Sequence, residues 1–233
     1  MTREARRLFV GVRVSVGTAN ALAGAVETLA RRAGAAKLAI RWVPPTLYHV
    51  TLKYLGWAQE ETLTALCDRL AEVVDGTSPL TFSTARLGAF PDRARASVVW
   101  AGVSSRDDAL GDLARRIDAA TAELGFSSER PFVGHVTLGR LAAPADVGDV
   151  LLPLMEQMFS DTKVPGVSLL ESTLKSGVLT YEERAFFELS SAKTASKRQS
   201  PSLQLGPQGA PSSLDPSSHD IETDDGWPRG HSP

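Results

Sequence analysis

The tetrapeptide HVTL occurs twice, at residues 49–52 and 135–138, each time inside a segment whose pattern predicts a β-strand. Side chains on a strand alternate between two faces, so the histidine and threonine of each copy share one face. The valine and leucine share the other face. Each copy is therefore predicted to have an apolar back that packs on helices and a front that carries one imidazole and one hydroxyl. The repeat favours a fold of two related halves.

The remaining pattern predicts an α+β fold with two similar lobes, arranged with approximate two-fold symmetry. In each lobe a mainly antiparallel sheet lines a central cleft, and helices lie on the outside. The predicted helices are 19–33, 59–75, 106–124 and a short one near 146–159. The predicted strands are 7–14, 38–43, 47–56, 79–90, 96–103, 131–141, 167–175 and 184–190, with 176–183 as a connecting loop.

The composition changes near residue 190, after which Ser, Pro and Gly dominate. Such a segment buries too little apolar surface to offset its ordering entropy, so we predict a folded domain at 1–190 and a disordered tail at 191–233. Two of the four histidines, His219 and His231, lie in this tail. The candidates for chemistry are therefore the two histidines of the repeated motif.

The charge balance is 25 basic against 27 acidic residues, a net charge of −2, which disfavours extended duplex binding but leaves room for a small basic cleft. Cys67 is the single cysteine, so a disulfide framework is excluded, and its helical context predicts a buried core residue. The sequence shows no signal peptide and no apolar run long enough for a membrane span. We expect a cytoplasmic monomer.

Two imidazoles on one face suit acid–base catalysis, because one of His49 and His135 can be neutral while the other is protonated near neutral pH. In-line displacement at phosphorus needs both forms: a base for the attacking oxygen and an acid for the leaving oxygen. The hydroxyls of Thr51 and Thr137 can bind non-bridging phosphoryl oxygens. A zinc site is the rival chemistry, but it needs three or four ligands. We predict no metal and no cofactor.

Five segments in sequence order resemble the two-histidine phosphoesterase superfamily, and within it the RNA 2′,3′-cyclic phosphodiesterases, historically called 2′-5′ RNA ligases. They are RLFVGVRV, IRWVPPTLYHVTLKYLG, LGAFPDRARASVVWAGV, ERPFVGHVTLGRL and LLESTLKSGVLTYEERAFFEL. The flanks RWVPP and RPF make the match more specific than the paired His-x-Thr alone. The resemblance spans about residues 7–190, and the tail has no counterpart.

The resemblance implies opening of a 2′,3′-cyclic phosphate to a 2′-phosphate without metal. The substrate would be an RNA with a cyclic phosphate terminus or a small cyclic nucleotide. His49 would be the proton donor to the departing O3′ and His135 the proton acceptor that activates water. Thr51 and Thr137 would bind the phosphate oxygens. The sequence itself does not say which histidine plays which role.

The resemblance also implies an arginine ligand for the phosphate, and Arg140 matches it. On a straight strand Arg140 would point away from the histidine face, so a bend at Gly139 is needed. Arg130 is a second candidate, with a structural ion pair as its alternative. Trp42 and Phe132 could stack on a base, although such aromatics more often belong to the core.

One position departs from the family pattern, which usually has proline before the second histidine, where this chain has Gly134. Glycine does not fix the local backbone, so we expect a looser approach to the second motif and a lower rate.

Two other functions stay open. The reverse reaction would join a cyclic phosphate end to a 5′-hydroxyl RNA by a 2′-5′ bond with the same residues, but about 55 M water favours hydrolysis. A non-catalytic module that binds RNA ends or nucleotides is the other alternative, and the intact His-x-Thr in both halves argues against it. A catalyst with two imidazoles should show a bell-shaped pH–rate profile near neutral pH.

Overall fold

The computed structural model describes residues 5–128 and 130–190. Its helices are α1 (Val16–Ala35), α2 (Leu63–Val74), α3 (Ala109–Ala122) and the short α4 (Gly148–Leu151), with 3-10 turns η1 (Pro45–Leu47), η2 (Glu60–Thr62), η3 (Arg106–Asp108) and η4 (Leu152–Leu154). Its strands are β1 (Ala5–Arg13), β2 (Ile40–Trp42), β3 (His49–Gln59), β4 (Leu80–Phe90), β5 (Ala96–Ser105), β6 (His135–Ala145), β7 (Met158–Val164), β8 (Gly166–Lys175) and β9 (Val178–Glu188).

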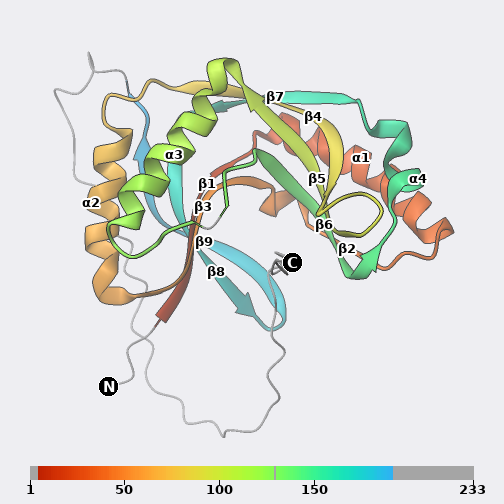
Figure 1. Cartoon of the computed structure of the whole chain (residues 1–233), viewed down its shortest axis with the longest axis horizontal. Coiled ribbons are helices and arrows are strands. Elements are labelled where there is room, and N and C mark those ends of the chain that lie inside the picture. The colour runs from red at the N-terminus through yellow and green to blue at the C-terminus, as the bar shows by residue number, and fades with distance from the viewer. Residues whose placement is uncertain (1–4, 129, 191–233) are drawn as a thin grey trace, which may run out of the picture.

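Within the described residues the strands form one nine-stranded sheet in the order β7-β4-β5-β6-β3-β1-β8-β9, with β2 paired to β6. Every strand pair is antiparallel. The two HVTL strands, β3 and β6, meet at the middle through a single residue pair, Val50 and Val136. The sheet therefore consists of two halves that are joined at the repeated motif, and the predicted two-lobed α+β fold is confirmed (Figure 1).

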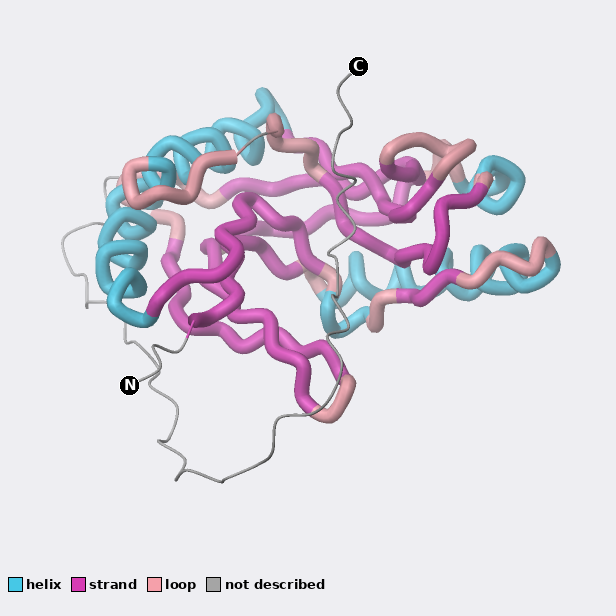
Figure 2. The backbone as a smooth tube through the Cα atoms, turned by 60° about the horizontal axis from the view of Figure 1, so that its bottom comes forward, coloured by secondary structure: helices cyan, strands magenta, loops and turns pink. Residues whose placement is uncertain are grey.

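The helices lie outside this strand core (Figure 2). The first helix, α1, packs on β7, whereas α2 and α3 pack together and contact β9 and β3 respectively. Helix α1 begins where the Ser15 hydroxyl accepts the Thr18 amide at 3.1 Å, a common N-cap, and it buries a stripe that includes Leu22, Ala25 and Leu29. Because helices cover the back of the sheet, its front is left for a site.

Two predicted elements were wrong. The helix expected near 146–159 ends early: α4 and η4 stop at Leu154, and Met158–Val164 is an edge strand. The first four residues of this strand, Met158–Asp161, include no buried side chain, so the sequence lacked a clear strand pattern there. The expected loop 176–183 is mostly strand, since β9 already begins at Val178. The hairpin turns at Ser176 and Gly177, which both have positive φ.

Three further predictions concern the cysteine, the C-terminal tail and membrane-spanning segments. Cys67 is free and buried in the core on α2, as predicted, and burial raises the pKa of its thiol. The predicted tail at 191–233, with His219 and His231, lies outside the described residues. Among the helices that the structure describes, none combines the length and the apolar character needed to cross a bilayer.

Candidate active site

The two histidines lie on the front of the sheet on either side of the strand pair that joins its halves. Val50 and Val136, directly opposite each other, are fully buried on the back. The neighbouring residues in each strand, including His49 and His135, are half-buried and point to the front. Strand alternation thus places both imidazoles and both threonine hydroxyls on one face, as the sequence predicts.

Each imidazole is held in the same way. Nδ1 of His49 lies 2.7 Å from the carbonyl oxygen of Leu47, and Nδ1 of His135 lies 2.7 Å from that of Val133. A carbonyl can only accept, so each ring carries its hydrogen on Nδ1 when neutral and presents Nε2 as the basic nitrogen. Nε2 of His49 lies 3.1 Å from the Thr51 hydroxyl. The two nitrogens that can exchange protons with a substrate are therefore the Nε2 atoms.

The surroundings lower the pKa of both imidazoles. Burial is the largest cause at His49, followed by the positive charges of His135, Arg13 and Arg140, and its pKa falls to about 4 although the Leu47 carbonyl opposes the shift. Burial and then Arg140 also lower the pKa of His135, against the effect of the hydrogen bond to Val133. In the absence of an anion, the site therefore favours two neutral rings beside a guanidinium.

Arg140 reaches the histidine face because β6 contains a β-bulge. Thr137 pairs with Trp100 of β5, but Gly139 pairs with the adjacent Val99, which leaves Leu138 as an extra residue. An extra residue reverses the alternation, so Arg140 returns to the front despite its odd spacing from the histidine. The bend that the sequence required is thus a bulge that begins one residue before Gly139.

The first half contains the same bulge. Thr51 pairs with Gly11 of β1 and Lys53 pairs with Val10, so Leu52 is the extra residue. The position that corresponds to Arg140 is occupied by Tyr54, which is exposed. The two motifs therefore share their backbone irregularity as well as their sequence, but only the second half supplies an arginine there.

The other three predicted binding residues are less central. Trp42 and Phe132 are half-buried and pack against the hydrophobic core, which favours their core role over stacking on a base. A Cβ at Gly139 would lie 2.8 Å from the Trp42 ring, so this indole covers the bulge. Arg130 is exposed on the irregular segment that leads into β6, and it stays a predicted phosphate ligand.

Four residues around the histidines were not predicted as site residues. The rings of Phe9 and Tyr181 lie 4.9 and 5.0 Å from that of His49, and the Phe90 ring lies 5.0 Å from that of His135. Arg13 of β1 stands directly opposite His49 in the antiparallel register. The alternation in 7–14 could have identified Phe9 and Arg13, because both lie on the strand face opposite Leu8, Val10 and Val12. Tyr181 lay in a predicted loop.

The approach to the second motif is tighter than predicted. A Cβ at Gly134 would lie 2.7 Å from the carbonyl oxygen of Val103, and the Gly134 carbonyl accepts the Val103 amide at 2.9 Å. Close contact between the two backbones explains the glycine, and the His135 ring is anchored at the same distance as the His49 ring.

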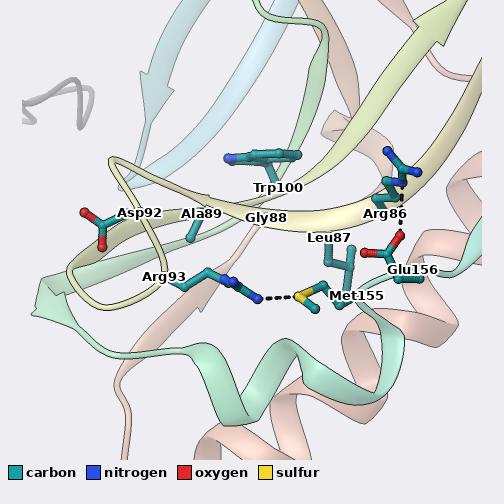
Figure 3. Close-up of a pocket in the computed structure, with 9 residues that line it drawn as sticks. All are labelled: Arg86, Leu87, Gly88, Ala89, Asp92, Arg93, Trp100, Met155 and Glu156. Atoms are coloured by element: carbon teal, nitrogen blue, oxygen red, sulfur yellow. Dashed lines mark hydrogen bonds and ion pairs between the residues drawn. The ribbon is translucent and has the colours of Figure 1, made fainter.

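A separate hollow of about 390 Å³ lies beside β4 (Figure 3). Within it Arg86 pairs with Glu156 at 3.1 Å, and Arg93 donates to a methionine sulfur. Trp100 lines this hollow, and its ring centroid lies 6.4 Å from that of His135. The indole thus borders both regions, and the hollow is not the place where the two motifs meet.

A family model described as LigT like Phosphoesterase matches residues 16–100 and 102–180. The chain belongs to the LigT-like phosphoesterase family. A protein of Archaeoglobus fulgidus named RNA 2′,3′-cyclic phosphodiesterase is 30% identical over 183 residues, which are 78% of this chain and 99% of that protein. A protein of the same name from Methanothermobacter thermautotrophicus is 27% identical over 186 residues, 78% of this chain and 98% of that protein.

Solved structures of similar proteins agree with this assignment to the LigT-like phosphoesterases. TT0787 of Thermus thermophilus superposes with a TM-score of 0.67 at 25% identity and covers 79% of this chain and 98% of its own. E. coli LigT complexed with 3′-AMP gives a TM-score of 0.63 at 25% identity, with 80% and 99% covered. The chain is therefore a phosphoesterase of this family, and the resemblance inferred from the paired motifs is confirmed.

Proposed function

We propose that the chain hydrolyses RNA 2′,3′-cyclic phosphate ends to 2′-phosphomonoesters without a metal ion, with His49 as proton donor and His135 as proton acceptor. The observation that carries the proposal is the matched pair of imidazoles, each anchored through Nδ1 at 2.7 Å and each turned to the same face. The names of the two curated relatives support the choice of RNA 2′,3′-cyclic phosphate as substrate.

The reaction is one displacement at phosphorus. Nε2 of His135 takes a proton from water as the water oxygen forms a bond to phosphorus. The bond from phosphorus to O3′ breaks, and Nε2 of His49 gives its proton to O3′. Thr51 and Thr137 donate hydrogen bonds to the non-bridging oxygens, and Arg140 neutralises the charge that develops on them. The products are a 2′-phosphate and a 3′-hydroxyl.

A difference between the two sides of the site supports this order of roles. In-line attack places water opposite O3′, so the ribose lies on the side of the proton donor. Arg13 and Tyr181 stand beside His49 and can contact a nucleotide, whereas Gly102 of β5 stands opposite His135 and adds no side chain. The side of His135, where position 102 adds no side chain, suits water, and the side with the exposed guanidinium of Arg13 suits the nucleoside.

The first test uses a short RNA that ends in a 2′,3′-cyclic phosphate, incubated with EDTA and the wild type, His49→Ala or His135→Ala. Each variant should lose about 10²–10⁴-fold in rate, the usual contribution of a general acid or base, while EDTA leaves the wild type unchanged. The product should be the 2′-phosphate. Arg31→Gln, on the outer helix α1, serves as a control and should retain the rate.

The outcomes separate the alternatives. A 3′-phosphate product would contradict the proposed leaving group, and loss of turnover in EDTA would contradict the metal-free mechanism. Binding of the cyclic end without turnover would favour a binding module, and joining of an added 5′-hydroxyl RNA would favour ligation.

A substrate with sulfur in place of O3′ tests the two roles. A thiolate leaves without a proton far more readily than an alkoxide, so this substrate should restore the rate of His49→Ala but not that of His135→Ala. Restoration in the opposite variant would reverse the assignment.

A further inference from the structure

The front of β1 continues the face that carries the histidines. Along this strand the side chains alternate, so Arg7, Phe9, Gly11 and Arg13 share the front. The back consists of Leu8, Val10 and Val12, which are all buried. Gly11 pairs with Thr51 and Arg13 with His49 in the antiparallel register, and directly paired residues project to the same side of a sheet. The strand thus places the buried ring of Phe9 between two guanidinium groups beside the site.

The guanidinium of Arg13 is held in place without being neutralised. It is exposed, and it donates to the carbonyl oxygens of Thr46 and Tyr181, each at 3.5 Å. Within residues 5–128 and 130–190 it contacts no carboxylate. Its charge contributes to the low pKa of His49, which agrees with its position across the strand pair. A positive charge is therefore oriented beside the site and available to an anion.

Aromatic rings line the path between the two arginines. Tyr181 of β9 lies edge-on to Phe9 and to His49, with ring centroids 5.0 Å apart in both cases. Further along, Arg7 donates from Nε to the Tyr54 hydroxyl at 2.8 Å, and its guanidinium carbon lies 5.7 Å from the centre of that ring. Cations interleaved with aromatic rings are typical of surfaces that bind single-stranded nucleic acid.

A bulge in the last hairpin brings Tyr181 to this place. Leu169 pairs with Ala185 and Leu170 with Glu183, so Arg184 is the extra residue in β9. A bulge bends its strand and increases its twist. Beyond the bulge, Tyr181 of the hairpin contacts Phe9 of β1.

We infer that Arg7, Arg13, Tyr54 and Tyr181, the β1 surface, bind the RNA chain on the 5′ side of the cyclic phosphate, so that the substrates are oligonucleotide ends rather than cyclic mononucleotides. The inference rests on the proposed function and on His49 facing the ribose. Arg13 lies six positions beyond Arg7, roughly 20 Å along an extended strand, which exceeds the reach of one nucleotide. The net charge of −2 fits a short single strand better than a duplex.

The test compares kcat/KM for cytidine 2′,3′-cyclic phosphate with that for a trinucleotide that ends in the same group. The wild type should favour the trinucleotide at least tenfold, and Arg7→Gln/Arg13→Gln should reduce this ratio about tenfold. The matched control is Arg31→Gln/Arg106→Gln, which removes two exposed charges elsewhere and should keep the ratio. Thermal melting of each variant checks that it is folded.

Salt gives an independent readout. Each phosphate contact to a single strand contributes about −0.7 to the slope of log affinity against log salt, so two contacts should steepen the trinucleotide slope by about 1.4. The double variant should lose this difference. Equal salt slopes for the two substrates in the wild type would overturn the inference, and so would a double variant that slows both substrates equally.

Failure of the proposed function can be told apart from failure of this inference. If the wild type hydrolyses neither substrate, the function is wrong, and the surface is then tested by fluorescence anisotropy with a labelled trinucleotide that ends in a 2′-phosphate. Salt-sensitive binding that Arg7→Gln/Arg13→Gln weakens about tenfold supports the surface. Equal binding by the wild type and the double variant rejects it.

Discussion

The low pKa of the two imidazoles predicts that the free enzyme works best in mild acid rather than at neutral pH. For His49 the fall from 6.5 to about 4 corresponds to about 3 kcal/mol against the imidazolium, with burial as the main cause. The pKa of His135 is lowered as well. At pH 7 both rings of the free enzyme are therefore mostly neutral, and His49, the proposed proton donor, mostly lacks its proton.

The consequence is a shifted bell. Turnover needs a protonated His49 and a neutral His135, so kcat/KM rises as pH falls below 6.5 and the pair takes up its first proton. At still lower pH both rings are protonated, and kcat/KM falls. The sequence alone predicts a maximum near neutral pH. Because both pKa values are lowered, the maximum should instead lie between them, on the acid side of 6.5. A bound phosphate anion favours the imidazolium, so the maximum of kcat should lie at higher pH than that of kcat/KM.

Initial rates across pH at constant ionic strength measure both profiles, and NMR titration of the histidine ring protons measures the free pKa values directly. Addition of a nucleoside 2′-monophosphate should raise the pKa of His49. His135→Ala should also raise it, because one of the charges that oppose the imidazolium is removed. A His49 ring that titrates near 6.5 in the free protein, or a kcat/KM maximum above neutral pH, would refute the reasoning.

Three further predictions follow from individual contacts. Thr51→Val and Thr137→Val keep the side-chain shape but remove the hydroxyl, so each should lower kcat about 10²-fold at unchanged melting temperature; a full rate in steady-state kinetics would exclude phosphate binding by that hydroxyl. Gly134→Pro, the residue usual in the family, should lower both melting temperature and kcat because a Cβ there would meet a β5 carbonyl oxygen at 2.7 Å; a faster, more stable variant would show that the backbone moves freely. Asp118→Ala leaves the buried ammonium of Lys53 without its carboxylate, so the free energy of unfolding measured with denaturant should fall by about 1–3 kcal/mol. The loss should be smaller than for a fully buried pair because Asp118 is 41% exposed. Adding Lys53→Met to this variant should recover most of the lost stability, and no recovery would contradict this account.

The sequence was sufficient to predict the histidine face because that prediction depends only on strand alternation. His49 and Thr51 share a face on any regular strand, and so do His135 and Thr137. The pairing of the two strands at Val50 and Val136 is consistent with the repeat, but only the structure shows that these strands are neighbours. Local pattern and global arrangement agree at this point, so the core of the candidate site could be derived before the structure.

Arg140 shows where sequence reasoning ended. Whether it faces the histidines depends on one extra residue, Leu138, and an extra residue exists only relative to the partner strand. Tyr181 had a similar difficulty, because its segment contains few alternating apolar residues and becomes a strand by pairing with β8. Register is a property of two strands together, and one sequence read along its length does not contain it.

The two halves are nearly equivalent at the motif, and the proposed direction of the reaction rests on where they differ. A side chain at Gly102 would place its Cβ 2.9 Å from a backbone carbonyl oxygen of β4, so the position opposite His135 is restricted to glycine. The position opposite His49 has no such restriction and holds Arg13. In the proposed mechanism the repeated motif supplies the acid and the base, and the neighbours that differ favour water beside Gly102 and a nucleotide beside Arg13. With the two roles exchanged, the nucleoside would lie beside Gly102, where the backbone leaves no room for a side chain that could contact it.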